Sequence, residues 1–225
     1  SLMMVRPPPR STPARTLSPY ATLLAAWLSN NGGASASDVC SGVNWTNNYT
    51  GLSDGCGNTG SATVIFTATD SCGNSTSTTA TFTIEDTTAP TIDTPAQDAT
   101  AECDGSGNAS ALAAWLSNNG GASASDICSG VNWTNNYTGL SDGCGNTGTA
   151  TVIFTATDSC GNSTSTTATF TIEDTTAPTI DTPAADQTVE CDGSGNASAL
   201  AAWLSNNGGA SASDICSGVN WTNNY

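Results

Sequence analysis

The chain has 225 residues and a formal net charge of −16, with 19 acidic residues, three arginines and neither lysine nor histidine. Without lysine or histidine, Ser-His-Asp and Cys-His nucleophiles and lysine Schiff bases are excluded, so we predict that the chain is not an enzyme. The arginines are Arg6, Arg10 and Arg15. Beyond them no cationic side chain can bind phosphates, which excludes nucleic-acid binding. No apolar run reaches the ~18 residues of a membrane-spanning helix, and we expect no membrane insertion.

An 88-residue repeat organises the sequence. Trp27, Trp115 and Trp203 each lie in the segment Ala-Ala-Trp-Leu-Ser-Asn-Asn-Gly-Gly, at intervals of 88 residues. When residues 25–100 are aligned with residues 113–188, four positions differ. A period of this length suits one small domain rather than one turn of a solenoid. The predicted organisation is repeat 1 at residues 25–87, which lacks its N-terminal strand, a complete repeat 2 at 88–175, and a truncated repeat 3 at 176–225.

Residues 1–24 depart from this repeat and form an aberrant segment that contains all the arginines and a Pro-rich run. The stretch from Arg6 to Thr12 reads Arg-Pro-Pro-Pro-Arg-Ser-Thr. A one-nucleotide slip in codons for the sequence at Thr87–Thr94 would produce that stretch. Our hypothesis is that the segment is a frameshifted reading of an upstream repeat. The alternative is an ordinary Pro-rich linker.

The first half of repeat 2 predicts a connector, a short strand and a helix. Thr88–Pro95 contains two prolines and is expected to be an extended connector. Asp98–Cys103 reads as a short strand, and Asp104–Asn108 as a turn. Ala109–Ser117 is the one helical stretch, because apolar side chains recur at i, i+3 and i+4 and the following Asn-Asn-Gly-Gly ends the helix.

The second half of repeat 2 predicts strands. Apolar and polar residues alternate over Gly130–Thr138, over Thr149–Asp158 and over Thr167–Glu173, which is the period of half-buried strands. Trp115 on the helix and Trp133 on the first of these strands lie on apolar faces, and we expect both in the core rather than stacked on sugars. The fold class that follows is mainly β, with a predominantly antiparallel sandwich and one short inserted helix in each repeat.

The cysteines of repeat 2 can be sorted by geometry. Cys144 and Cys160 lie at opposite ends of a ten-residue strand, about 30 Å apart, which is far beyond the ~7 Å limit between the Cα atoms of a disulfide. In an up-down hairpin, Cys128 would meet Cys160 at one end and Cys103 would meet Cys144 at the other. We therefore predict the disulfides Cys103–Cys144 and Cys128–Cys160.

The same scheme predicts a Cys40–Cys72 bond in repeat 1. It leaves Cys56, Cys191 and Cys216 without partners. A zinc site is disfavoured because the chain has no Cys-x-x-Cys motif and no histidine. Disulfides imply an oxidising setting, so we expect a secreted or cell-surface protein.

The segment Thr151-Val-Ile-Phe-Thr-Ala-Thr-Asp-Ser-Cys-Gly-Asn162 and the following Ala168–Pro178 resemble the hyalin (HYR) repeat. The four-cysteine, helix-bearing front half is similar to the HYR-like tandem variant of bacterial surface proteins. The resemblance covers the chain from about residue 25 onward. It implies tandem immunoglobulin-like antiparallel β-sandwich repeats in an adhesion protein, and it carries over no catalytic residue. Ala177-Pro178 replaces the usual Pro-Pro of the family.

Two groups of oxygen ligands are candidate calcium sites. Asp104, Ser106 and Asn108 alternate along a glycine-rich loop, as ligands of hard cations often do. The competing interpretation of this loop is an Asx-turn followed by a helix N-cap. The second group lies at the junction with repeat 3, where calcium would stiffen the linker, and comprises Glu173, Asp174 and Asp181. A solvated linker without metal is the competing interpretation there.

These observations predict an extracellular structural segment, namely the disulfide-stabilised stalk or filament of a surface adhesin. The expected partners are adjacent repeats or copies of the same chain, assembled head to tail. The alternative function is an adhesion module that binds glycans or other ligands through exposed aromatic or acidic side chains. Near-identity between copies favours the first function, because separately specialised sites would have diverged.

Overall fold

The computed structural model describes residues 19–225, which form two compact units, one ending at Thr87 and one running from Thr88 to Tyr225. The hypothesis of a frameshifted N-terminal segment falls mainly on residues 1–18, outside the described residues. Residues 19–24 belong to the first helix. Among the described residues, no helix has the length and hydrophobicity needed to cross a bilayer.

The described part of the first unit contains one α-helix, one short 3-10 helix and one three-stranded sheet. Strand β2 lies in the centre and pairs antiparallel with both β1 and β3. The elements are α1 (Pro19–Ser29), the short 3-10 helix η1 (Asn31–Gly33), β1 (Asn44–Asn47), β2 (Gly60–Thr69) and β3 (Ser75–Ile84).

The central sheet of the second unit has four strands in the order β5-β9-β8-β7. Strand β8 pairs antiparallel with β7 and β9, whereas β5 runs parallel to β9. The predicted alternating strands are confirmed, and the predicted helix is confirmed at the residues expected. The elements are β5 (Ala99–Glu102), α2 (Ala109–Ser117), β7 (Val131–Asn135), β8 (Gly148–Asp158) and β9 (Ser163–Glu173).

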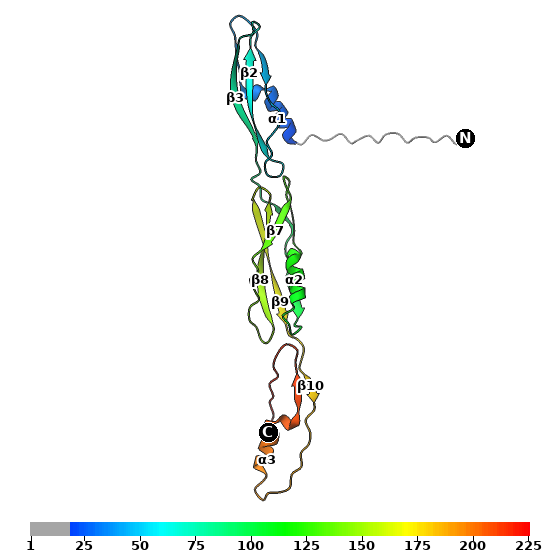
Figure 1. Cartoon of the computed structure of the whole chain (residues 1–225). Coiled ribbons are helices and arrows are strands. Elements are labelled where there is room, and N and C mark those ends of the chain that lie inside the picture. Colours follow the sequence, from blue (N-terminus) through cyan, green and yellow to red (C-terminus); the bar gives the residue numbers. More distant parts are fainter. Residues whose placement is uncertain (1–18) are drawn as a thin grey trace, which may run out of the picture. The chain divides into compact units, whose positions relative to one another are not determined.

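A second layer covers one face of this sheet. Helix α2 lies along the sheet that contains β7, β8 and β9 (Figure 1). Strands β4 and β6 form a short antiparallel pair, which the sequence analysis does not predict. The predicted extended connector provides one of its two strands. These additional elements are β4 (Thr91–Thr94), the 3-10 helix η2 (Asn119–Gly121) and β6 (Ser123–Ser125).

The core of the second unit lies between α2 and the central sheet. Val152 and Phe154 of β8 are fully buried. Trp115 of α2 packs edge-on against Phe154 with ring centroids 5.2 Å apart, and lies 5.5 Å from Phe170 of β9. The opposite face of β8 is a threonine row in which Ile153 remains 41% exposed. The predicted core position of Trp115 is therefore confirmed.

Residues 176–225 repeat the beginning of this arrangement. Strand β10 pairs antiparallel with β11, as β4 pairs with β6. The elements are β10 (Thr179–Thr182), α3 (Ala197–Ser205), the 3-10 helix η3 (Asn207–Gly209) and β11 (Ser211–Ser213). The described chain is thus mainly β, with several sheets and few helices, as the alternation of apolar and polar residues predicts.

Truncation of Phe154 should open a cavity beneath Trp115. We expect Phe154→Ala to destabilise the second unit by about 3–5 kcal/mol, measured as faster hydrogen exchange of the β8 and β9 amides. Ile153→Ala, on the exposed face of the same strand, should cost less than about 1 kcal/mol. The near-identical strands β2 and β3 provide an internal control, since their exchange should not change. Equal effects of the two variants would contradict this assignment of the core.

Candidate functional site

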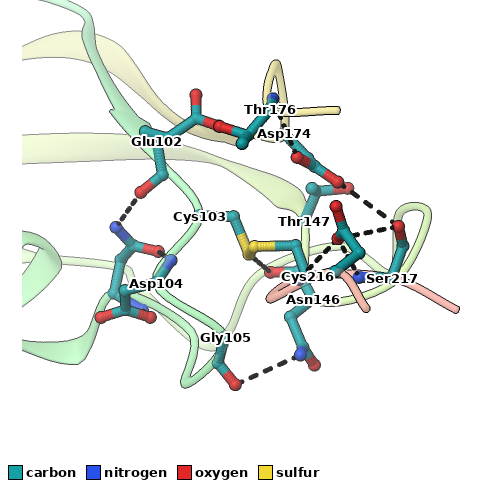
Figure 2. The surroundings of a disulfide bond; sticks show 12 residues. Glu102, Cys103, Asp104, Gly105, Asn146, Thr147, Asp174, Thr176, Cys216 and Ser217 are labelled. Atoms are coloured by element: carbon teal, nitrogen blue, oxygen red, sulfur yellow. Dashed lines mark hydrogen bonds between the residues drawn. A yellow bond between two sulfur atoms is a disulfide. The ribbon is translucent and has the colours of Figure 1, made fainter. Parts of the chain in front are cut away.

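A disulfide joins two different copies of the repeat. Cys103, directly after β5, is bonded to Cys216, which follows β11, across a sequence separation of 113 residues (Figure 2). The two Cα atoms are 6.0 Å apart. Both residues are buried, at 7% and 5% exposure. The bond therefore links predicted repeat 2 to predicted repeat 3, and it is the centre of the site described below.

This bond shows that the predicted Cys103–Cys144 pairing is wrong. The two cysteines were expected at the same end of the sheet, and Cys103 Sγ does lie 3.7 Å from the carbonyl oxygen of Asn146 in the neighbouring loop. Cys144 nevertheless is an exposed free thiol. The physical reason is that a loop of the next repeat reaches this end of the sheet and supplies Cys216 instead.

The other predicted pairings also fail. Cys40 and Cys72 are both exposed free thiols, so they do not bond to each other. Cys160 is disulfide-bonded, whereas Cys128 is in the thiol form, which rules out a bond between these two. Cys56, expected without a partner, is disulfide-bonded. The predicted pairing scheme assumes that each repeat forms its disulfides within itself.

The strand pairing at the end of the central sheet positions Cys103. The parallel pairing of β5 with β9 places Glu102 opposite Glu173, and the next amide, that of Cys103, donates to the Glu173 carbonyl at 2.8 Å. The disulfide then extends the apolar core, because Cys103 and Cys216 form one cluster with Leu112 of α2 and with Phe170 and Ile172 of β9. Residues of the next repeat thus complete a core that β9 and α2 begin.

An Asx-type network shapes the loop after Cys103. Asp104 Oδ1 accepts the backbone N–H groups of Ser106 at 2.8 Å and of Asn108 at 3.0 Å. Asn108 is itself buried, and its Nδ2 donates to the Glu102 carbonyl at 2.7 Å. Asn108 precedes α2 with a left-handed backbone but without a side-chain cap bond. The Asx-turn interpretation is confirmed, and the N-cap interpretation is not.

A similar network shapes the loop that carries Cys216. Asp214 Oδ1 accepts the N–H groups of Cys216 and Ser217, both at 2.8 Å. The Cys216 carbonyl in turn accepts the N–H of Asn146 at 2.9 Å. The Nδ2 group of Asn146 donates to the Gly105 carbonyl at 3.2 Å. Asn146 therefore ties together the two loops that the disulfide joins (Figure 2).

Two glycines let the loops approach each other. A Cβ atom at Gly145 would overlap the carbonyl oxygen of Cys216, and one at Gly105 would lie 2.8 Å from the carbonyl oxygen of Ile215. Both glycines also have positive φ angles, +61° and +74°. Any side chain at these positions would push the next repeat away from the sheet.

The linker between the two repeats is held from both sides. The carboxylate of Glu102 accepts the N–H of Thr175 at 3.0 Å, the Thr175 hydroxyl at 2.8 Å and the Thr176 hydroxyl at 2.9 Å. On the other side, Asp174 accepts the N–H of Thr176 at 3.2 Å and the hydroxyl of Ser217 at 3.5 Å. The linker is therefore fixed to repeat 2 and to repeat 3.

Hydrogen bonds, rather than cations, stabilise the acidic groups around this disulfide. Bonds from the N–H and hydroxyl of Thr175 and from the Thr176 hydroxyl lower the pKa of Glu102. The N–H groups of Asn108 and Ser106 lower the pKa of Asp104. Those of Cys216 and Ser217 lower the pKa of Asp214. Each carboxylate is thus stabilised in its charged form by donors of its own loop or of the linker.

The two predicted calcium sites have different geometries. The loop of Asp104, Ser106 and Asn108 is brought together, but Asp104 Oδ1 already accepts two amide N–H groups. Within the described residues, the carboxylates of Glu173, Asp174 and Asp181 do not converge on one point. Asp181 instead accepts the hydroxyl of Ser213 at 2.9 Å. Calcium binding remains a prediction.

The predicted alternative of sugar binding would need exposed aromatic side chains. Trp133 packs against the core cluster together with Trp115, whose Nε1 donates to the Gln97 carbonyl at 3.0 Å. The equivalent Trp203 of α3 lines an open hollow of about 350 Å³ with Leu200 and Val189.

No family model matches the chain. No curated protein matches it either. Among solved structures, the Drosophila N-cadherin EC1-4 crystal structure is similar with a TM-score of 0.26 and 15% sequence identity. The match covers 60% of this chain and 42% of the cadherin chain, so this chain spans less than half of that structure. A likeness of this size does not bear on the function.

The lowered pKa of Glu102 predicts acid sensitivity of the junction. Its contribution to stability is fully present above the ordinary value of 4.5 and is lost as the pH falls through the lower folded value. Glu102→Gln should therefore lower the melting temperature at pH 7, and the difference from the unaltered chain should shrink below pH 4.5. Glu190→Gln, at the equivalent position of repeat 3, is the control and should have little effect. A difference that does not depend on pH would contradict this role of Glu102.

Proposed function

We propose that the chain is a non-enzymatic, extracellular structural segment that transmits tension along an array of repeats, as a stalk or filament of a surface protein does. The observation that carries this proposal is the Cys103–Cys216 disulfide, which connects one copy of the repeat to the next. A bond inside one repeat would stabilise only that repeat. A bond between copies also fixes the connection that a spacer has to maintain.

The proposed fold family is the HYR-like branch of immunoglobulin-like sandwiches. The antiparallel β7, β8 and β9, together with the parallel addition of β5, are consistent with such a sandwich. The Thr-Ala-Thr-Asp…Gly-Asn segment of the HYR repeat corresponds to the end of β8 and the following turn. In that turn, Asp158 accepts the N–H groups of Cys160 at 2.8 Å and of Asn162 at 2.9 Å.

The junction is suited to bear load. A disulfide that closes a loop of 113 residues restricts the unfolded chain by about 4.7 kcal/mol in the chain-entropy model. More important for a stalk, force applied to the chain outside Cys103 and Cys216 passes through the covalent bond. The residues between them are then shielded from extension. The oxidising setting that such a bond requires agrees with a secreted or cell-surface location.

Single-molecule force spectroscopy of the full chain tests this proposal. With the disulfide intact, stretching should release no chain from the segment between Cys103 and Cys216. After reduction of all disulfides, the same segment should add about 370–400 Å of contour length, whereas the double variant Cys103→Ser/Cys216→Ser keeps the disulfide of Cys160 and should add less. A Cys144→Ser variant is the control and should behave like the unaltered chain. Full extension of the oxidised chain would contradict the load-bearing role.

Calcium stiffening is a separate part of the proposal. If the acidic loops bind calcium, addition of millimolar Ca²⁺ should raise the melting temperature, and EDTA should reverse the effect. Asp104→Asn should abolish the shift if the loop at Asp104 is the site, whereas Asp181→Asn should abolish it if the linker is the site. An unchanged melting temperature would reject calcium and leave the disulfide-based function untouched.

A further inference from the structure

The Cys103–Cys216 disulfide, called the occupied junction below, joins two loops that each carry one of the bonded cysteines. Each of these loops is one half of the junction. One half is the loop Glu-Cys-Asp-Gly-Ser-Gly-Asn that contains Cys103, and the other is the loop Asp-Ile-Cys-Ser-Gly that contains Cys216. Because the sequence repeats, each half recurs with nearly identical residues. The first half recurs around Cys191 and the second around Cys40, and both of these cysteines are exposed free thiols.

The half at Cys191 has the same internal bonds as the occupied half. Asp192 Oδ1 accepts the N–H groups of Ser194 at 2.7 Å and of Asn196 at 3.0 Å, and Asn196 Nδ2 donates to the Glu190 carbonyl at 2.8 Å. The corresponding distances around Asp104 are 2.8, 3.0 and 2.7 Å. The loop therefore has the conformation that holds Cys103 for its bond.

The half at Cys40 is also preformed. Asp38 Oδ1 accepts the N–H groups of Cys40 at 2.8 Å and of Ser41 at 2.9 Å. Asp214 makes the same two bonds beside the bonded Cys216, both at 2.8 Å. The geometry of the loop does not depend on whether its cysteine is bonded.

The surfaces beside the two free thiols are complementary. In the occupied junction, Ile215 reaches Gly105, and its Cγ2 would lie 2.9 Å from a Cβ atom there. The equivalent of Gly105 in repeat 3 is Gly193, which has nothing within 4 Å among the described residues. The equivalent of Ile215 in repeat 1 is Val39, whose side chain is fully exposed at 101%. The half at Cys191 therefore has open space beside Gly193, and the half at Cys40 has the exposed apolar side chain of Val39.

We infer that Cys191 of one copy of the chain and Cys40 of a second copy form the same disulfide junction as Cys103 and Cys216, which links copies head to tail. This inference deepens the proposed structural function, because it extends the observed junction from repeats within a chain to repeats of two chains. The proposed occupant of each half is a second copy of this chain, because every copy carries the complementary loop with its free thiol.

The covalent step requires a disulfide oxidant. Each of the two thiols loses one proton and one electron, and the S–S bond forms between Cys191 and Cys40. A small-molecule disulfide is reduced to two thiols in exchange, through a mixed disulfide at one of the cysteines. Both cysteines are exposed, so the oxidant can reach either of them.

Association must overcome like charge, since each copy carries a net charge of −16. The carboxylates nearest the two thiols, Asp38 and Asp192, accept amide hydrogen bonds, as Asp214 and Asp104 do in the occupied junction. Long-range repulsion between copies is screened by salt. Linkage should therefore be faster in about 0.5 M NaCl than at low ionic strength.

The test incubates the full chain in a buffer of oxidised and reduced glutathione, followed by non-reducing electrophoresis and peptide mapping. We expect a ladder of multimers whose principal cross-linked peptide contains Cys40 and Cys191. Cys40→Ser and Cys191→Ser should each abolish this peptide, and mixing these two variants should yield dimers only. Cys144→Ser should leave the peptide unchanged.

A second pair of variants separates specific docking from random oxidation of exposed thiols. Val39→Asp keeps every cysteine and should slow formation of the Cys40–Cys191 peptide by about tenfold, as expected when one valine no longer becomes buried. The matched control is Ile127→Asp, because Ile127 is 91% exposed in the same loop of repeat 2. This control should have no effect on the rate.

Three results would overturn the inference. These are cross-links that involve mainly Cys72 or Cys144, a Cys40–Cys191 bond found only within single chains, or equal rates for Val39→Asp and Ile127→Asp. Loss of the Cys103–Cys216 peptide from the same map would instead contradict the proposed function. The two failures can therefore be told apart in one experiment.

Discussion

The rest of the structure depends on where the Cys103–Cys216 bond is made. Cys103 lies at the end of a strand whose position is fixed by the parallel pairing of β5 with β9. Cys216 lies in a loop of the following repeat. Since Cys216 enters the apolar cluster of Leu112, Phe170 and Ile172, the core of one repeat is finished by residues of the next. The contacts that stabilise the core of repeat 2 are consequently also contacts that connect it to repeat 3.

The absence of cationic side chains beyond Arg15 makes this arrangement demanding. Acidic groups gather where two acidic repeats meet, and none of the described residues has a cationic side chain that could form a salt bridge with them there. At the junction, backbone N–H groups and threonine hydroxyls instead donate hydrogen bonds to the carboxylates, for example to those of Glu102 and Asp214. Such bonds depend on the local backbone conformation, so ordering of the linker and ionisation of the carboxylates support each other.

Much of the fold could be predicted from local patterns. The i, i+3, i+4 spacing of Leu112, Trp115 and Leu116 predicts α2, and the threonine alternation predicts β8 and β9. The β4–β6 pair could not be predicted, because Ser-Ala-Ser has no alternation of apolar and polar residues. The disulfide partners could not be predicted for a different reason. In near-identical repeats, a cysteine of one copy and its equivalent in the next have the same local sequence. Local sequence therefore cannot distinguish a bond within a repeat from one between repeats.

The spacing of the observed bond does make that distinction. A separation of 113 residues exceeds the 88-residue period by 25, which is the distance from Cys103 to Cys128 within repeat 2. Counted back from Cys128, the same spacing reaches Arg15, which cannot form a disulfide. The thiol form of Cys128 agrees with this spacing. One rule, a bond from the first cysteine of a repeat to the second cysteine of the next, accounts for both cysteines.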